Sequence, residues 1–135
     1  MKSVLLVGLG GFVGANLRYL VCDWAVKRWG DSFPIGTMIV NVIGSFIIGF
    51  LVMLLAEKFT EDLALKKFVI TGFLGAFTTF SSYMIEVVQL VTGQDNTHHG
   101  WLYLIGSIIL GMIAVLAGTY VAIQLMPVEA APAAA

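Results

Sequence analysis

A hydroxyl and an amide lie within an apolar stretch that carries no charge from Ser32 to Ala56. Thr37 precedes Asn41 by four residues, so both side chains share one face of a helix. The amide of Asn41 offers two N–H donors and one acceptor oxygen. Two roles remain open for it: a hydrogen bond that joins two helices, and a donor to a small anion in a pore.

A second polar run lies in a later charge-free stretch of the chain. It combines glycines with Thr78-Thr79 and Ser81-Ser82, and all three residue types have low helix propensity. An unwound turn from Gly75 to Thr79 would free carbonyl oxygens, which suit a hard monovalent cation such as Na⁺. The alternative is an intact helix whose hydroxyls bond back to the preceding turn.

Aromatic side chains follow at helical spacing. Phe80 and Tyr83 are three residues apart and share a face with Phe77. Because an aromatic ring has a positive edge, such rings and an amide can stabilise a small anion without a full charge that would trap it. The same stripe also suits an ordinary core or a lipid-facing surface. Tyr103 and Ser107, four apart, would extend a polar track along a later helix.

Two charged residues lie near the ends of apolar stretches. Arg18 could reach the membrane interface with its long side chain, or it could hold an anion at a vestibule. Glu86 comes one turn after Ser82. Its side chain could likewise face a vestibule or reach the membrane interface.

The elements that must position these residues are membrane spans. The chain is 59% apolar and only 11% charged, whereas a soluble domain carries about 25% charged residues. A bilayer core needs about 20 mostly apolar residues as helix. We predict an all-α membrane protein with four transmembrane helices, the third broken in mid-membrane: Ser3–Val21, Phe33–Ala56, Phe68–Val91 and Trp101–Met126.

These helices are expected to form one channel domain, residues 1–126, followed by a disordered Ala/Pro-rich tail, residues 127–135. Lys2 and the apolar run after it resemble a signal peptide. However, Arg18 and Asp23 occupy the place of a small-residue cleavage site, so we expect a retained first span. Small residues four apart, such as Gly10 and Gly14, suggest close helix packing.

Composition and motifs also exclude several classes of protein. The net charge is −1, which gives no basic field for nucleic acid. The only cysteine is Cys22, so no intrachain disulfide can form. We find no nucleophile–base pair, phosphate loop or dinucleotide fingerprint, and His98-His99 in a turn lacks further metal ligands. The sequence therefore predicts neither an enzyme nor a nucleic-acid-binding protein.

Positive charge is nearly balanced between the two sides of the predicted membrane. Four lysines would lie on one side and three basic residues on the other, so the positive-inside rule gives almost no bias. Two explanations remain open: insertion in both orientations, which permits an antiparallel dimer, or orientation set by a lipid or by buried Arg18. The residues concerned are Lys2, Lys58, Lys66 and Lys67 against Arg18, Lys27 and Arg28.

Three segments together resemble the signatures of the Fluc/CrcB fluoride channel family. They occur in order and at family spacing, and the resemblance covers about residues 3–125. The segments are Gly10–Tyr19 in the first helix, Gly36–Phe46 in the second and Gly72–Ser81 in the third.

The resemblance implies an antiparallel, dual-topology homodimer in the inner (plasma) membrane, with two fluoride pores. It also implies a central structural Na⁺ held by the backbone carbonyls of Gly75 and Thr78 from each subunit. Arg18 would lie at the vestibule, together with Glu86. The predicted fluoride pore is lined by Asn41, Phe80, Tyr83, Thr37, Tyr103, Ser107 and Ser81.

The chain departs from the family pattern at two places. Tyr83 stands where members usually have Phe, which keeps the ring edge and adds a hydroxyl, so we expect conduction at an altered rate. Ile109 and Ile113 stand where some members continue the polar track on the fourth helix, which leaves a hydroxyl-lined path beyond Ser107 in question.

The predicted function is passive export of cytoplasmic fluoride, which lowers its toxicity. The runner-up is a small proton-coupled exporter of cationic drugs, which would need a membrane-buried carboxylate. Ser3–Val21 contains none, and Glu86 is the candidate. A third hypothesis, an assembly subunit without transport of its own, leaves the polar residues inside the spans unexplained.

Overall fold

The first two helices form a hairpin in the computed structural model, which describes residues 1–57, 63–93 and 97–125. Helix α1 spans Lys2–Trp29 and helix α2 spans Ile35–Glu57. Gly30 ends α1 with φ +83° and donates its N–H to the Val26 carbonyl at 2.8 Å. Glycine adopts this left-handed conformation without steric cost, so it permits a tight turn into α2.

The third apolar stretch is built from several short elements. It contains α3 (Leu63–Leu65), the π-helix η1 (Lys66–Leu74), α4 (Gly75–Phe77) and α5 (Phe80–Thr92). A π-helix was not expected here, because the sequence predicted an α-helix over Phe68–Val91 that is broken in mid-membrane. The last helix, α6, spans Thr97–Leu125.

Four helical stretches are long and apolar enough to cross a membrane in the part of the chain that the structure describes. Many large apolar side chains point outward along α1 and α6, as a lipid environment or a second copy would favour. The chain is therefore an all-helical, multi-pass membrane protein. Its stretches are Lys2–Trp29, Ile35–Leu54, Lys66–Thr92 and Thr97–Leu125.

The backbone leaves the helical conformation between α4 and α5. Thr78 has φ −86° and ψ 157°, and Thr79 has φ −149° and ψ 118°, so both are extended. The predicted unwinding began at Gly75, but Gly75 is still helical, with φ −61° and ψ −29°. Two successive β-branched residues tolerate the extended conformation well, which accounts for its position at the threonines.

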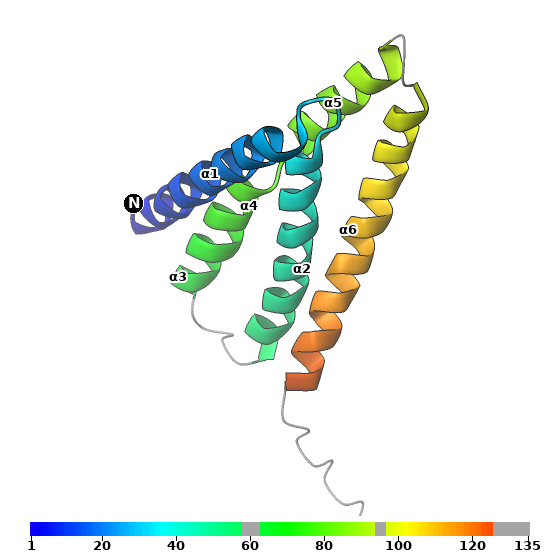
Figure 1. The fold of residues 1–135 in the computed structure, drawn as a ribbon. Helices are drawn as coiled ribbons and strands as arrows, with labels where there is room; N and C mark the ends of the chain where they lie inside the picture. Colours follow the sequence, from blue (N-terminus) through cyan, green and yellow to red (C-terminus); the bar gives the residue numbers. More distant parts are fainter. Residues whose placement is uncertain (58–62, 94–96, 126–135) are drawn as a thin grey trace, which may run out of the picture.

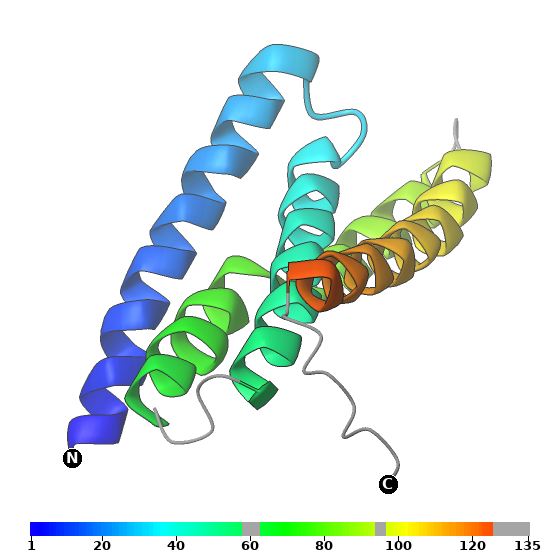
Figure 2. The ribbon, with the colours of Figure 1, turned by 90° about the horizontal axis from the view of Figure 1, so that it is seen from below.

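Helix α2 lies in the middle of the bundle (Figure 1). Helix α6 packs along one side of it, and α1 lies with η1 and α4 on the other side, as the view from below also shows (Figure 2). Helix α5 leaves this second group and runs beside the beginning of α6. The interruption at Thr78 and Thr79 is thus where the third stretch passes α2 and changes its packing partner.

Glycines make these close contacts possible. A β-carbon at Gly14 would overlap the Phe73 carbonyl oxygen of η1, and one at Gly118 of α6 would overlap the Phe46 carbonyl oxygen of α2. Small residues let helix backbones approach in this way. The small-residue pairs noted in the sequence therefore serve helix packing within one chain.

Two further differences concern the helix ends. His98 and His99 were expected in a turn but lie exposed in the first turn of α6, which begins earlier than expected. The predicted tail, residues 127–135, lies outside the described residues.

We predict that Gly14→Ala lowers the free energy of unfolding by about 1–3 kcal/mol, because overpacking forces the backbones apart. The matched control is Gly8→Ala on the same helix, where a new β-carbon meets nothing within 4 Å. Denaturant unfolding in detergent micelles measures both. Equal destabilisation by the two variants would contradict the close-contact explanation.

Candidate functional site

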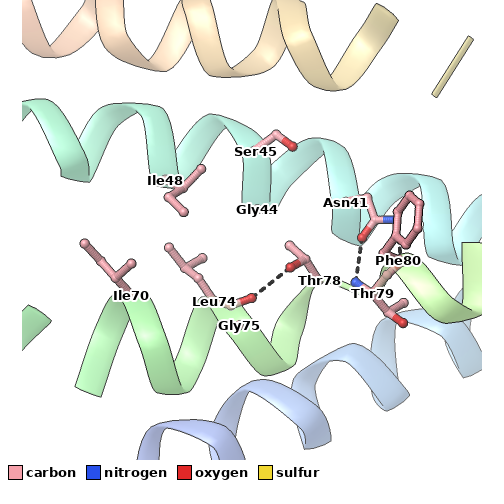
Figure 3. Close-up of a pocket in the computed structure, with 10 residues that line it drawn as sticks. All are labelled: Asn41, Gly44, Ser45, Ile48, Ile70, Leu74, Gly75, Thr78, Thr79 and Phe80. Carbon is pink, nitrogen blue, oxygen red and sulfur yellow. Dashed lines mark hydrogen bonds between the residues drawn. The ribbon is translucent and has the colours of Figure 1, made fainter. Parts of the chain in front are cut away.

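The side chain of Asn41 binds both backbone groups of Thr79 at the interruption. Asn41 Nδ2 donates to the Thr79 carbonyl at 3.0 Å, and the Thr79 N–H donates to Asn41 Oδ1 at 2.8 Å (Figure 3). The Asn41 Oδ1 thus replaces the helical acceptor that the Thr79 N–H gives up, and its NH₂ group is a further donor to the carbonyl of Thr79, the N-cap of α5. Because the NH₂ group has two protons, one N–H of Asn41 remains for another acceptor.

The threonine hydroxyls complete the interruption. Thr79 Oγ1 accepts from the Ser82 N–H at 3.3 Å and so caps the N-terminus of α5. Thr78 Oγ1 donates back to the Leu74 carbonyl at 3.0 Å. The sequence left two alternatives open, an unwound turn and hydroxyls that bond back to the preceding turn. The structure has an unwound backbone at Thr78 and Thr79. It also has one hydroxyl, that of Thr78, bonded to the preceding turn.

Gly75 and Thr78, whose carbonyls the family resemblance implies as Na⁺ ligands, both line a pocket beside this interruption. The Thr79 N–H, which would close a helical bond onto the Gly75 carbonyl, donates to Asn41 instead. The extended ψ of Thr78 turns its carbonyl away from the helix direction. Hard oxygen donors of this kind fit a monovalent cation. The pocket has a volume of about 280 Å³ and is lined by Asn41, Gly44, Ser45, Ile48, Ile70, Leu74, Gly75, Thr78, Thr79 and Phe80.

A second cavity, of about 310 Å³, contains four of the predicted pore residues. Phe80 is 73% exposed, whereas Tyr83 is only 5% exposed. Ser107 Oγ is buried and has no hydrogen-bond partner among the described residues. A buried hydroxyl without a partner is costly, so this group is available to a ligand. The cavity is lined by Asn41, Ser45, Phe80, Tyr83, Ser107, Ile108, Gly111, Met112 and Val115.

The carboxylate of Glu86 joins three helices. Thr37 Oγ1 of α2 donates to Glu86 Oε1 at 2.6 Å, and the Tyr103 hydroxyl of α6 donates to Glu86 Oε2 at 2.7 Å. Thr37 and Tyr103 are 5% and 1% exposed, so the carboxylate binds inward. Thr37 and Glu86 also line a third cavity of about 230 Å³ near the α1–α2 turn. Glu86 therefore accepts hydrogen bonds from side chains inside the bundle and lies at the edge of this cavity.

Aromatic rings connect this carboxylate to the second cavity. Tyr103 and Tyr83 meet edge-on with centroids 5.1 Å apart, and Tyr83 and Phe80 are 6.1 Å apart. Phe33 adds an edge-on contact to Tyr103 at 5.4 Å. A continuous series of side chains thus runs from Glu86 past the rings to Asn41.

Two predicted residues stand apart from this series. Arg18 on α1 is half-buried and makes no hydrogen bond or ion pair with the residues that the structure describes. Ser81 is exposed, and its hydroxyl lies 3.5 Å from Thr79 Oγ1.

Two residues at the site were missed in the sequence. Thr79 supplies the backbone groups that Asn41 binds, and Ser45 lines both the first and the second cavity. The signal for Ser45 was available, because it follows Asn41 by one helical turn. The partner of Asn41 had no such signal, because the contact joins distant parts of the chain.

The part of the chain that the structure describes is thus that of a multi-pass helical membrane protein with polar side chains gathered at cavities between its helices. Residues 5–119 match the family described as CrcB-like protein, Camphor Resistance (CrcB), and the chain belongs to this family.

Curated relatives share most of their length with the chain. A protein of Rhizobium meliloti (strain 1021) named "Fluoride-specific ion channel FluC" is 44% identical over 118 residues, which is 87% of this chain and 94% of the relative. A protein of the same name from Roseiflexus sp. (strain RS-1) is 44% identical over 89% of this chain and 96% of its own. One from Chloroflexus aurantiacus is 38% identical over 87% and 93%.

We predict that Asn41→Ala destabilises the protein by about 1–3 kcal/mol, because the Thr79 N–H is left without an acceptor. The matched control is Ser45→Ala, one turn further along α2, whose hydroxyl bonds to no described residue. Denaturant unfolding in micelles compares the two. A loss no greater for Asn41→Ala than for Ser45→Ala would contradict the role of the amide at the interruption.

Proposed function

We propose that this protein is a fluoride-selective channel that lets cytoplasmic fluoride leave the cell. The observation that carries the proposal is the second cavity, where the amide of Asn41, the unpartnered Ser107 hydroxyl and the rings of Phe80 and Tyr83 meet. Its lining contains no lysine or arginine. The names of the relatives support fluoride as the ion.

The chemistry of this lining suits a strongly hydrated small anion. Fluoride must exchange its water for N–H, O–H and ring-edge donors, which neutral groups supply without holding the ion too tightly. Asn41 and Ser107 offer such donors. Thr37, Tyr103 and Ser81 are also assigned to the proposed path, although the hydroxyl protons of Thr37 and Tyr103 are donated to Glu86. Entry is thereby favourable while release remains possible.

Export needs no energy source beyond the membrane potential. Hydrogen fluoride enters as a neutral molecule in acid surroundings and ionises in the cytoplasm. The inside-negative potential then drives the trapped anion outward. Arg18 at a vestibule would attract the ion at the mouth of the path.

The working assembly in this proposal is an antiparallel, dual-topology homodimer in the inner membrane, with two pores. The near balance of basic residues on the two sides supports insertion in both orientations. The interruption at Thr78 and Thr79 is the mid-membrane break of the third span. The carbonyls of Gly75 and Thr78 from two copies would hold a structural Na⁺, which supplies positive charge that fixes the two breaks against each other.

The direct test is fluoride efflux from proteoliposomes, recorded with a fluoride electrode and compared with chloride efflux. We expect rapid release of fluoride and none of chloride. Release of neither ion, together with proton-coupled uptake of a cationic dye, would instead support the exporter, with Glu86 as its carboxylate.

We predict that Asn41→Asp abolishes fluoride efflux. An ionised carboxylate only accepts hydrogen bonds, so it removes the free donor and adds a negative charge that repels the anion. The control is Gln124→Glu, which makes the same chemical change at an exposed position near the end of α6. Unchanged efflux in Asn41→Asp would remove Asn41 from the pore.

A further inference from the structure

The hydroxyl of Tyr83 is already bonded within the protein. It donates to the backbone carbonyl of Leu104 on α6, while Tyr83 itself belongs to α5. The side chain is 5% exposed, and its ring meets Tyr103 edge-on on one side and Phe80 on another. This hydrogen bond therefore connects the two helices that form one wall of the second cavity.

A phenol has a single proton to donate. With that proton on the Leu104 carbonyl, the hydroxyl oxygen of Tyr83 presents only lone pairs to its other neighbours. Lone pairs repel an anion, so the hydroxyl cannot serve as a donor to the ion while the bond to Leu104 exists. Tyr83 can still offer the positive edge of its ring.

The same bond fixes the part of α6 that carries Ser107. Leu104 and Ser107 are three residues apart, so they are neighbours along one side of the helix. Holding Leu104 against α5 thus holds Ser107 Oγ, which is buried without a partner, beside the cavity that Asn41 and Phe80 line from the other helices.

We propose that Tyr83 is a positioning residue, whose hydroxyl ties α5 to α6 through Leu104 and thereby sets the orientation of the Tyr83 ring and of Ser107, while the hydroxyl itself never contacts the ion. The inference rests on the proposed fluoride path. It assigns the hydroxyl of Tyr83, which a Phe would lack, to holding α5 against α6. The groups that donate to the ion are then Asn41, Ser107 and the ring edges.

The first experiment observes the hydrogen bond itself. The Fermi doublet of tyrosine in ultraviolet resonance Raman spectra reports whether the phenol donates or accepts, and the difference between wild type and Tyr83→Phe isolates the Tyr83 signal. We expect a strong donor signature that is the same in fluoride and in chloride. A signature that changes when fluoride replaces chloride would overturn the proposal, because it would place the hydroxyl on the ion.

The second experiment measures flux. Tyr83→Phe keeps the ring and removes only the attachment, so fluoride efflux should slow about two- to tenfold, the factor that corresponds to one neutral hydrogen bond. The control is Tyr120→Phe on α6, a tyrosine that is 63% exposed, which should match wild type.

Each other outcome for Tyr83→Phe contradicts the proposal. Slowing of more than about tenfold is the loss expected for a hydrogen bond to a charged group, which would make the hydroxyl an ion ligand. A rate within about twofold of wild type, or a faster one, would mean that the hydroxyl does not position the wall. Failure of the proposed function is distinguishable, because wild type would then release no fluoride while the Raman donor signature persisted.

Discussion

Asn41 and Thr79 exchange two hydrogen bonds across the centre of the bundle, and the rest of the site depends on this exchange. Inside a bilayer, a backbone that leaves the helix needs a partner for each N–H and carbonyl, because no lipid group can supply one. The Asn41 amide supplies the acceptor that the Thr79 N–H has lost and adds a donor to the Thr79 carbonyl. The third stretch can therefore change direction at Thr78 and Thr79 and pack first against α1 and then against α6.

The same amide lines two cavities, which also share Ser45 and Phe80. The first lies over the interruption and includes Gly75 and Thr78, while the second contains Tyr83 and Ser107. Asn41 lines both, so a group that stabilises the backbone is also the group with a free donor toward the proposed ion path. In the proposed function, structure and conduction are therefore coupled at this residue, and a substitution there is expected to affect both.

Much of this arrangement could be predicted from local sequence, and the rest required long-range contacts. Charge-free apolar stretches predict the four spans. Four-residue spacing predicts one face for Thr37 and Asn41, but the two side chains bind different partners and line different cavities. The sequence could not reveal that Glu86 binds Thr37 and Tyr103, because helix periodicity gives the face of a residue and not its partner. The π-helix Lys66–Leu74 was missed for a related reason, since helix periodicity alone does not distinguish it from an α-helix.

The two N–H bonds of the Asn41 side chain offer the most direct test of this dual role. Nuclear magnetic resonance of protein labelled with ¹⁵N at asparagine, with Asn41→Ala to assign the signal, observes both protons during titration with fluoride. The account predicts that one proton shifts with fluoride and not with chloride, while the other keeps its hydrogen bond to the Thr79 carbonyl. If neither proton responds to fluoride, or if both leave Thr79 together, Asn41 does not serve the backbone and the ion at once.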